Sequence, residues 1–259
     1  MTQWQTLFKK EIIDYWRNFK WIWVPLVIIL LAIMDPITTY FLPQIMEMSG
    51  GLPEGAVFDM PTPTPSEAIM MSLSQLSSLG VLVVVLISMG IISEEKQSGI
   101  TEMILVKPVS YTNYVMAKWM AFLLLVWVSL ALGMLGSWYY VNVLFGSLSF
   151  LSLVQIIFFY GLWLTLVATI SIFFNSLFKK PGIVAFMTIA SLMILSLLTQ
   201  FFGDYFLWSP SNLSRHINGM LITNDISKGL IATSSVTLCS IALLLVGSIA
   251  LFKAKELGK

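Results

Sequence analysis

The sequence "SEEKQSGITEMILVKPVSYTNYVMAK", residues 93–118, mixes acidic and basic side chains with a glycine and a proline. It lies between two apolar runs, each of more than twenty residues. About 20 predominantly apolar residues are enough for one helix to cross the hydrocarbon core of a bilayer. The sequence therefore predicts that this segment joins two transmembrane helices and lies outside the lipid.

The composition of the whole chain indicates a membrane protein. Of its 259 residues, 58% are hydrophobic and 10% are charged, against roughly 45–50% and 25% in soluble domains. The net charge of +1 indicates neither a nucleic-acid partner nor an acidic substrate. The single cysteine, Cys239, excludes an internal disulfide framework and a cysteine-rich metal site. We expect no cleavable signal peptide, because residues 1–20 lack a short apolar core followed by small residues.

Six stretches of the chain have the length and apolar character of a transmembrane helix. The expected spans are Trp21 to Leu42, Glu67 to Ile92, Tyr114 to Val141, Leu151 to Ser176, Pro181 to Phe202 and Gly229 to Phe252. The predicted fold class is all-α: a polytopic membrane protein with six transmembrane helices. We expect residues 1–259 to form a single transmembrane domain.

The basic residues predict the orientation of the spans. Lys and Arg gather in the cytoplasmic flanks of membrane proteins. Of the 14 in this chain, twelve fall on one side of the predicted spans, and only Arg215 and Lys228 fall on the other. Both termini and residues 93–113 are therefore predicted to be cytoplasmic.

The N-terminal residues 1–20 have the pattern of an amphipathic helix. Its apolar side includes Trp4, Phe8, Ile12 and Trp16, while lysines and other polar residues fall opposite. Such a helix is expected to lie in the inner membrane interface, with its aromatic side chains in lipid. Packing against the helices of its own bundle is the alternative, and the two are compatible.

Two larger loops are predicted on the outer side. The first, from Pro43 to Ser66, is rich in prolines and should be an extended connection that serves as a spacer or partner contact. The second, Gly203 to Lys228, should contain a short helix. Ser209 is its expected N-cap, Pro210 its first residue, and Gly219 its possible end.

The sequence offers no catalytic site, and we expect the chain not to be an enzyme. His216 is the only histidine, which excludes a zinc pair of the HExxH type and favours a loop histidine over a ligand. Neither a GxSxG elbow nor a phosphate-binding GxxxxGK[ST] loop is present. Within the spans only Asp35 and Glu67 are candidates for ion coupling, and a structural role is favoured for Asp35, which precedes Pro36. Ion coupling is therefore disfavoured, and energy for any transport must come from elsewhere.

The segment at residues 93–118 is where such a subunit could act. Glu94 and Glu95 follow the second span, Gly99 permits a sharp turn, and Pro108 would end a helix of about two turns. The apolar side of that helix would consist of Ile100, Met103, Ile104 and Val106. A solvated hairpin is the alternative.

These residues resemble the six-span permease subunits of ABC-2 type transporters, which are bacterial ATP-driven exporters. The resemblance extends over the whole chain and is strongest between the second and third spans. The matching residues are Glu95, Gly99, Glu102, Ile104, Leu105, Pro108, Val109, Ser110 and Lys118. Ile100, Tyr111 and Ala117 depart from the family pattern of Thr, Arg and Gly.

The resemblance implies a mechanism. Two permeases, identical or related, would form a pathway in the bacterial cytoplasmic membrane, and two separate ATPase subunits would hold ATP and magnesium. Residues 93–107 would be the coupling helix that contacts the ATPase through Glu95, Gly99, Glu102, Ile104, Leu105 and Pro108. The N-terminal segment would be the elbow helix. No cofactor is expected in this chain itself.

Only the nearly uncharged spans indicate what kind of cargo the chain would carry. These favour a hydrophobic or amphiphilic compound, such as an antimicrobial peptide or drug. Small and hydroxyl residues in the first three spans are the expected places for a lining or a close helix contact. The alternative function is a non-transporting membrane module that anchors or regulates a signalling partner.

Overall fold

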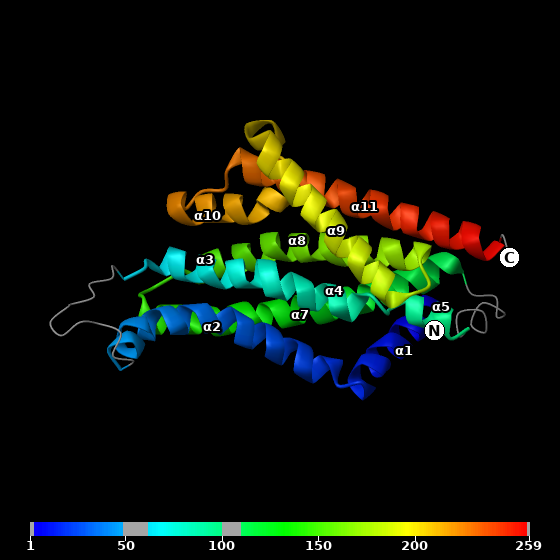
Figure 1. Cartoon of the computed structure of the whole chain (residues 1–259), viewed down its shortest axis with the longest axis horizontal. Helices are drawn as coiled ribbons and strands as arrows, with labels where there is room; N and C mark the ends of the chain where they lie inside the picture. Colours follow the sequence, from blue (N-terminus) through cyan, green and yellow to red (C-terminus); the bar gives the residue numbers. More distant parts are fainter. Residues whose placement is uncertain (1–2, 49–61, 100–109, 258–259) are drawn as a thin grey trace.

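The structure, a computed structural model, describes residues 3–48, 62–99 and 110–257, and every regular element in these ranges is a helix (Figure 1). Six of its helical stretches are long and apolar enough to cross a membrane. They are Lys20–Met46, Pro65–Gln97, Tyr111–Leu144, Phe150–Leu177, Pro181–Phe202 and Lys228–Ala254. The predicted all-α fold with six membrane-spanning helices is confirmed.

The chain begins with two helices that meet at a corner. Helix α1 (Gln3–Arg17) is followed directly by α2 (Lys20–Met48), and Phe19 between them has a left-handed backbone with φ 56°. The expectation that an outer loop begins at Pro43 is wrong, because α2 continues through Pro25, Pro36 and Pro43. Proline is tolerated inside transmembrane helices, where neighbouring groups satisfy the freed backbone carbonyls.

The second span is interrupted twice. It consists of α3 (Pro65–Gln75), a π-helical turn η1 (Leu76–Gly80), α4 (Val81–Ser88) and the short α5 (Ser93–Gln97). A capping box starts it: the Thr64 N–H donates to Glu67 Oε2 at 2.7 Å, and the Glu67 N–H donates to Thr64 Oγ1 at 3.3 Å. Glu67, one of the two candidates for ion coupling, therefore lies at the helix start as a capping residue.

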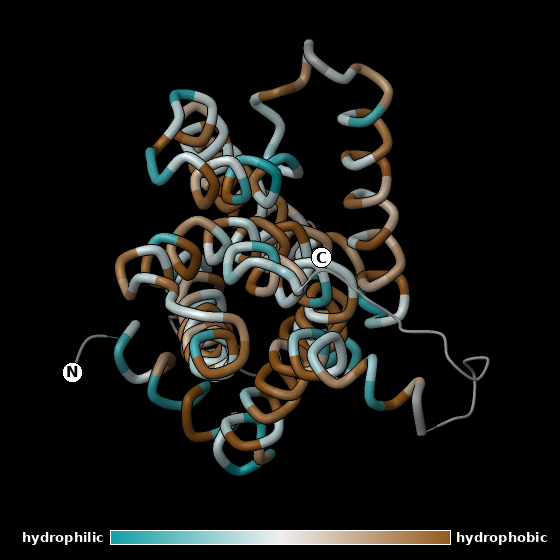
Figure 2. Tube along the Cα trace, turned by 90° about the vertical axis from the view of Figure 1, so that its left-hand side faces the viewer, coloured by the Kyte–Doolittle hydropathy of each residue, from teal (hydrophilic) through white to brown (hydrophobic). Residues whose placement is uncertain are grey.

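The remaining spans are longer and more regular. They are α7 (Tyr111–Leu144), α8 (Phe150–Leu177), α9 (Pro181–Phe202) and α11 (Lys228–Leu257). Helix α8 lies inside the bundle and is buried over most of its length (Figure 1). Apolar colouring runs along most of the length of the spans (Figure 2), and many large hydrophobic side chains on them are exposed, as expected for surfaces that meet lipid.

Short helices precede the last span, as predicted. They are the 3-10 turns η2 (Gly203–Phe206) and η3 (Pro210–Asn212) and the helix α10 (Leu213–Thr223). Pro210 is the first residue of η3, and Ser209 before it is extended but makes no capping hydrogen bond. Gly219 does not end the helix. The end is at Asn224, whose φ of 54° is the left-handed conformation that asparagine tolerates.

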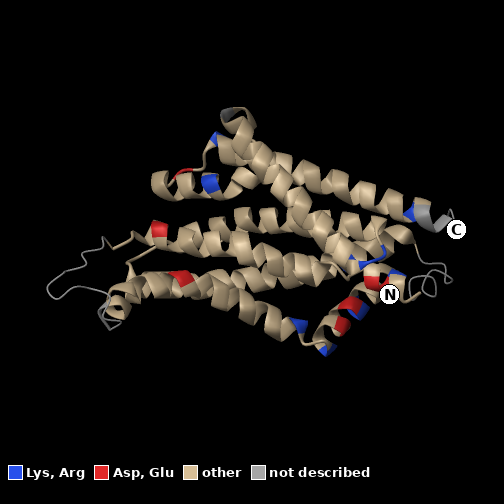
Figure 3. Ribbon diagram, in the orientation of Figure 1, with Lys and Arg blue, Asp and Glu red and all other residues tan. Residues whose placement is uncertain are grey.

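Charged side chains gather at one end of the bundle, which we call the charged end. It contains α1, α5, the start of α7 and the last turns of α11 (Figure 3). Residues 93–99 and 110–113 of the predicted cytoplasmic segment lie at this end, and residues 100–109 are outside the described part of the chain. The charged end is therefore the natural place to look for a contact with a soluble partner.

Candidate functional site

Four charged side chains form a cluster at the charged end, and we call it the ion-pair cluster: Lys10, Glu11, Glu95 and Lys118. Lys118 Nζ lies 3.0 Å from Glu95 Oε1 and 3.1 Å from Glu11 Oε1. Lys10 Nζ lies 3.0 Å and 3.2 Å from the same two oxygens. The cluster therefore ties α1 and α5 to the first turns of α7.

The ion-pair cluster is largely buried and electrically neutral. The side chains of Lys118, Glu11 and Glu95 are 3%, 7% and 18% exposed, and that of Lys10 is 48% exposed. Burial lowers the pKa of Lys10, but the carboxylates of Glu11 and Glu95 outweigh this effect and hold that pKa above its ordinary value. The Tyr114 hydroxyl also donates to Glu95 Oε2. Each buried charge thus has a partner of opposite sign, which burial requires.

Asn175 on α8 holds the break between α4 and α5. Its Oδ1 accepts from the backbone N–H groups of Ile92 and Ser93 at 3.1 and 3.0 Å. Its Nδ2 donates to the carbonyls of Ser88 and Ser171, both at 2.9 Å. A helix break leaves backbone groups without helical partners, and this one buried side chain satisfies the N–H groups of Ile92 and Ser93 and gives the Ser88 carbonyl a second donor beside the Ile91 N–H.

Lys96 attaches α5 to the end of α8. Its Nζ donates to the carbonyls of Asn175 and Ser176 at 3.1 and 2.8 Å, close to the end of α8. A cation at a helix C-terminus is favoured by the helix dipole. The same ammonium lies 4.6 Å from the centre of the Phe252 ring on α11. The exit of the second span is therefore attached to α1, α7, α8 and α11.

Only two of the six predicted coupling residues lie in the described part of the chain. Glu95 belongs to the ion-pair cluster, and Gly99 has the positive φ, 75°, that a sharp turn needs. Glu102, Ile104, Leu105 and Pro108 lie outside the described residues. Their contact with an ATPase stays a prediction.

The partners of Glu95, which are Lys10, Lys118 and the Tyr114 hydroxyl, were not predicted from the sequence. The roles of Glu11 and Asn175 were not predicted either, because these residues lie on helices that are distant along the chain. One signal was available: Lys118 lies two turns inside α7, where an amphipathic flank gives way to apolar residues. A lysine at such a depth needs a carboxylate partner.

The predicted interfacial helix has two different sides. Trp4 stacks on Phe8 with ring centroids 5.1 Å apart, and Phe8 and Ile12 pack against the hydrophobic core. Trp16 is 66% exposed. Packing against the bundle is thus observed for part of the helix, and an exposed aromatic residue remains for lipid. Its position in the membrane interface stays a prediction.

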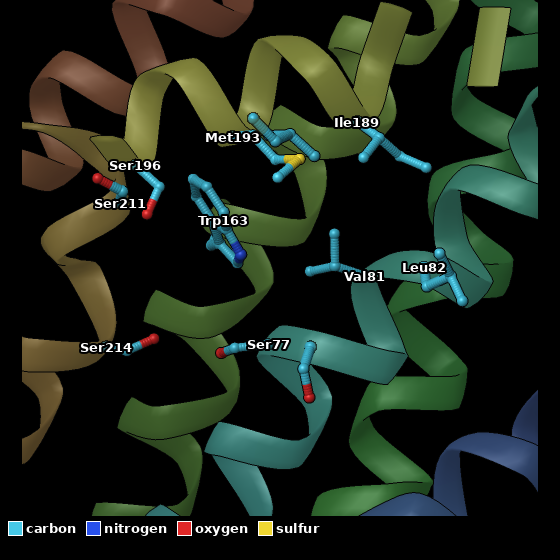
Figure 4. A pocket seen from close by; sticks show the side chains of 11 residues that line it. Ser77, Val81, Leu82, Trp163, Ile189, Met193, Ser196, Ser211 and Ser214 are labelled. Atoms are coloured by element: carbon cyan, nitrogen blue, oxygen red, sulfur yellow. The ribbon is translucent and has the colours of Figure 1, made fainter. Parts of the chain in front are cut away.

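A cavity of about 320 Å³ lies among α4, η1, α8, α9, η3 and α10, and we call it the serine cavity (Figure 4). Ser77 and Ser78 come from the π-helical turn, and Trp163 and Met193 face them from α8 and α9. Ser77 Oγ lies 3.2 Å from the hydroxyl of Tyr160. None of the described residues that line the cavity is charged. The lining therefore suits a ligand with apolar surface and a few hydrogen-bonding groups.

The other candidate polar residues have local roles. His216 lies within helix α10 and not in a loop, so the prediction of a loop histidine is wrong; its Nε2 lies 3.0 Å from the carbonyl oxygen of Leu207. Within residues 3–48, 62–99 and 110–257, no three His, Cys, Asp or Glu side chains come together in a way that could hold a metal ion.

Comparison with known proteins identifies the family of this chain. The family model described as "ABC-2 family transporter protein" matches residues 59–252, which is more than half of the chain. A relative from Bacillus subtilis (strain 168), named "Uncharacterized transmembrane protein YxlG", is 28% identical over 219 residues, covering 85% of each chain. The chain therefore belongs to the ABC-2 family of transporter proteins and is a multi-pass membrane protein of the permease type.

Proposed function

We propose that this permease exports a hydrophobic or amphiphilic compound, such as an antimicrobial peptide or drug, and that separate ATPase subunits drive it. The proposal rests on one observation: the end of the second span is attached to several other helices at the charged end. The ion-pair cluster, Asn175 and Lys96 join this exit to α1, α7, α8 and α11. Force applied to residues 100–109 would therefore reach several spans at once.

An ATPase can shift a permease between two conformations only if it binds them with different free energies. A loosely attached loop would absorb a movement of the ATPase without passing it on. The exit of the second span instead has charged and hydrogen-bonded partners on several helices, as described above. This supports residues 93–113 as the point of contact with the ATPase.

The serine cavity supports the proposed class of cargo. It opens between the second and fifth spans near their middle, and its described lining combines hydroxyl groups with Trp163, Leu192 and Met193. Such a surface binds apolar groups by burial and orients polar groups by a few hydrogen bonds. A strongly charged solute would find no partner among these residues. We propose that cargo passes through this cavity.

The proposed assembly contains two permeases, identical or related, and two ATPase subunits that carry ATP and magnesium. The chain itself would hold no cofactor. Both of its termini and the charged end would face the cytoplasm of a bacterium, because twelve of the 14 basic residues flank that side.

The test is reconstitution of the permease with its ATPase in lipid vesicles, with pull-down of the ATPase and cargo-stimulated hydrolysis as readouts. Ile104→Asp or Leu105→Asp places a charge in the expected contact, where an unpaired desolvated charge costs about 3–5 kcal/mol. Both variants should insert normally, lose ATPase binding and lose stimulation. Glu102→Ala should be milder, because a charge at the rim affects mainly the association rate.

Normal binding and stimulation in both aspartate variants would contradict the proposed contact. Failure of the wild-type chain to bind any ATPase would contradict export itself. That result would favour the alternative of a membrane module that anchors or regulates a signalling partner.

A further inference from the structure

Some of the polar groups that line the serine cavity already have protein partners. Ser77 Oγ lies 3.2 Å from the Tyr160 hydroxyl, and Ser211 Oγ donates to Thr199 Oγ1 at 2.8 Å. Ser78 Oγ donates to two backbone carbonyls of the preceding helical turn at 3.1 and 3.3 Å. These three serines are therefore engaged within the chain, and they leave the remaining polar groups of the lining to be explained.

Two hydroxyl groups of the lining, those of Ser196 and Ser214, are unpaired. Helix α9 carries four hydroxyl side chains, and three of them, Thr188, Ser191 and Thr199, donate to the carbonyl one turn earlier at 2.7 to 2.8 Å. Ser196, the fourth, forms no hydrogen bond with a described residue, and the same holds for Ser214 on α10. Neither oxygen is sealed from the cavity. Both hydroxyls are therefore free to bind an occupant.

Trp163 adds a third unpaired group, its indole N–H. The three tryptophans of α7 donate their indole N–H groups to protein oxygens at 2.9 to 3.0 Å. Trp163 on α8 forms no such bond with a described residue, and its nitrogen, unlike that of Trp21, is not sealed from the surface. The nitrogen lies on the side of the ring that faces Val81 (Figure 4). An indole N–H donates and cannot accept, so it requires an acceptor.

The depth of the serine cavity in the bundle makes these unpaired donors costly. The cavity lies between the second and fifth spans near their middle. Hydrocarbon contains no hydrogen-bond acceptor, so only water or a ligand inside the cavity can satisfy the three groups. None of the described lining residues is charged. A charged ligand would therefore lose its hydration here without gaining a partner.

We propose that Ser196, Ser214 and the Trp163 N–H select cargo with neutral hydrogen-bond acceptors, namely the carbonyl oxygens of uncharged amides or esters that stand beside aliphatic groups. The inference rests on the proposed function of the serine cavity as the cargo site. A short uncharged peptide with apolar side chains has this chemistry. Its carbonyl oxygens would accept from the three donors, and its side chains would pack on Leu192 and Met193. An ammonium group would present only donors to the indole N–H.

The test measures binding of radiolabelled probes to the purified full-length chain in lipid nanodiscs without an ATPase, and empty nanodiscs correct for partition into lipid. The probes are three forms of one compound, used at about pH 6 so that the end groups are fully charged. They are N-acetyl-dileucine methyl ester, which is neutral, N-acetyl-dileucine, an anion, and dileucine methyl ester, a cation. The neutral ester should bind at least about tenfold more tightly than either charged form.

Ser196→Ala and Ser214→Ala are the decisive variants. Neither hydroxyl has a partner among the described residues, so the melting temperature without probe should stay the same while affinity for the neutral ester falls about fivefold in each variant. Trp163→Phe should also weaken binding, although its smaller ring changes the shape of the cavity as well. Ser191→Ala is the matched control on α9, because Ser191 does not line the cavity, and it should leave the affinity unchanged.

The results separate this inference from the proposed role of the cavity. Equal affinity for the three probes, or unchanged binding of the neutral ester in both serine variants, would overturn the inference and leave the cavity in place as the cargo site. Ser78→Trp should abolish binding of the neutral ester, because it fills part of the cavity. Unchanged binding in Ser78→Trp, or no binding of any probe above empty nanodiscs, would overturn both.

Discussion

Lys118 Nζ lies 3.0 Å from Glu95 Oε1. This ion pair joins α5, at the end of the second span, to α7, the third span. The two residues are 23 positions apart in the chain (118 − 95). Glu11 of α1 accepts from the same lysine, which brings the N-terminal helix into the contact. Lys118 therefore joins α7 directly to both α5 and α1.

The first prediction concerns this ion pair. Lys118→Met leaves Glu11 and Glu95 buried with only the half-exposed Lys10 as a cation. Removing one partner of a buried pair costs about 3–5 kcal/mol, and Lys10 should keep the loss near 3 kcal/mol. Equilibrium unfolding in mixed micelles measures this loss as a decrease in the free energy of unfolding.

The double variant Glu95→Gln with Lys118→Met is the control, because it restores a neutral cluster of Lys10 and Glu11. Its loss should be smaller than the sum of the two single losses by about 1–3 kcal/mol. Strictly additive losses would show that the two side chains do not stabilise each other.

The second prediction concerns Asn175. Asn175→Leu keeps the approximate volume but leaves the N–H groups of Ile92 and Ser93 without their acceptor. Each unsatisfied buried donor costs about 1–3 kcal/mol. We expect lower stability and, in vesicles with the ATPase, less cargo exported per ATP hydrolysed.

Asn142→Leu, near the end of α7, is the matched control for Asn175→Leu on α8. Asn142 Oδ1 accepts from the Leu148 N–H at 2.8 Å and Nδ2 donates to the Trp138 carbonyl at 2.7 Å. This variant should also lose stability, yet its export per ATP should equal that of the wild type. The same loss of coupling in both variants would mean that Asn175 has only a general structural role.

The third prediction concerns the close approach of α2 and α7. A Cβ atom at Gly133 would lie 2.9 Å from Ile28 Cγ2 and 3.2 Å from the Ile28 carbonyl oxygen. Gly133→Ala should therefore destabilise the protein by about 1–2 kcal/mol. At Gly136 the nearest side-chain atoms are 3.5 and 3.6 Å away, so Gly136→Ala should be neutral or stabilising by up to about 1 kcal/mol. Thermal unfolding of Gly133→Ala and Gly136→Ala, measured side by side, tests this difference. Equal melting temperatures would argue against the close approach of α2 and α7 at Gly133.

The fourth prediction concerns the serine cavity. Ser78→Trp should fill part of the space between η1, α8 and α9. Basal ATP hydrolysis should persist, while its stimulation by cargo should fall at least tenfold. Leu238→Trp, on an exposed face of α11, adds a similar ring outside the cavity and should leave stimulation intact. If both variants respond to cargo as the wild type does, the cargo binds elsewhere.

The fifth prediction concerns topology. In a Cys239→Ser background, cysteines at Lys9, Ser98, Lys180 and Lys259 should react with impermeant reagents only from the cytoplasmic side. Cysteines at Thr62 and Asn212 should react only from outside. Labelling of Ser98→Cys from outside would reverse the orientation and remove the proposed ATPase contact.

The number and approximate position of the spans could be predicted from the sequence, because about 20 apolar residues in lipid have few alternatives to a helix. The sequence also predicted that Gly99 would turn and that short helices would precede the last span. These outcomes depend on local composition and backbone preference, which are readable from neighbouring residues.

The tertiary structure alone decided the partners of Glu95, the role of Asn175 and the serine cavity. Glu11 and Lys118 are 107 positions apart, and Asn175 is 83 from Ile92, so no local pattern connects them. It also decided that α2 continues through Pro43 and that α10 continues through Gly219, against the local signals. The physical reason is that buried charges and backbone groups take whichever partners the packed helices bring within about 3 Å, and only the fold sets which helices meet.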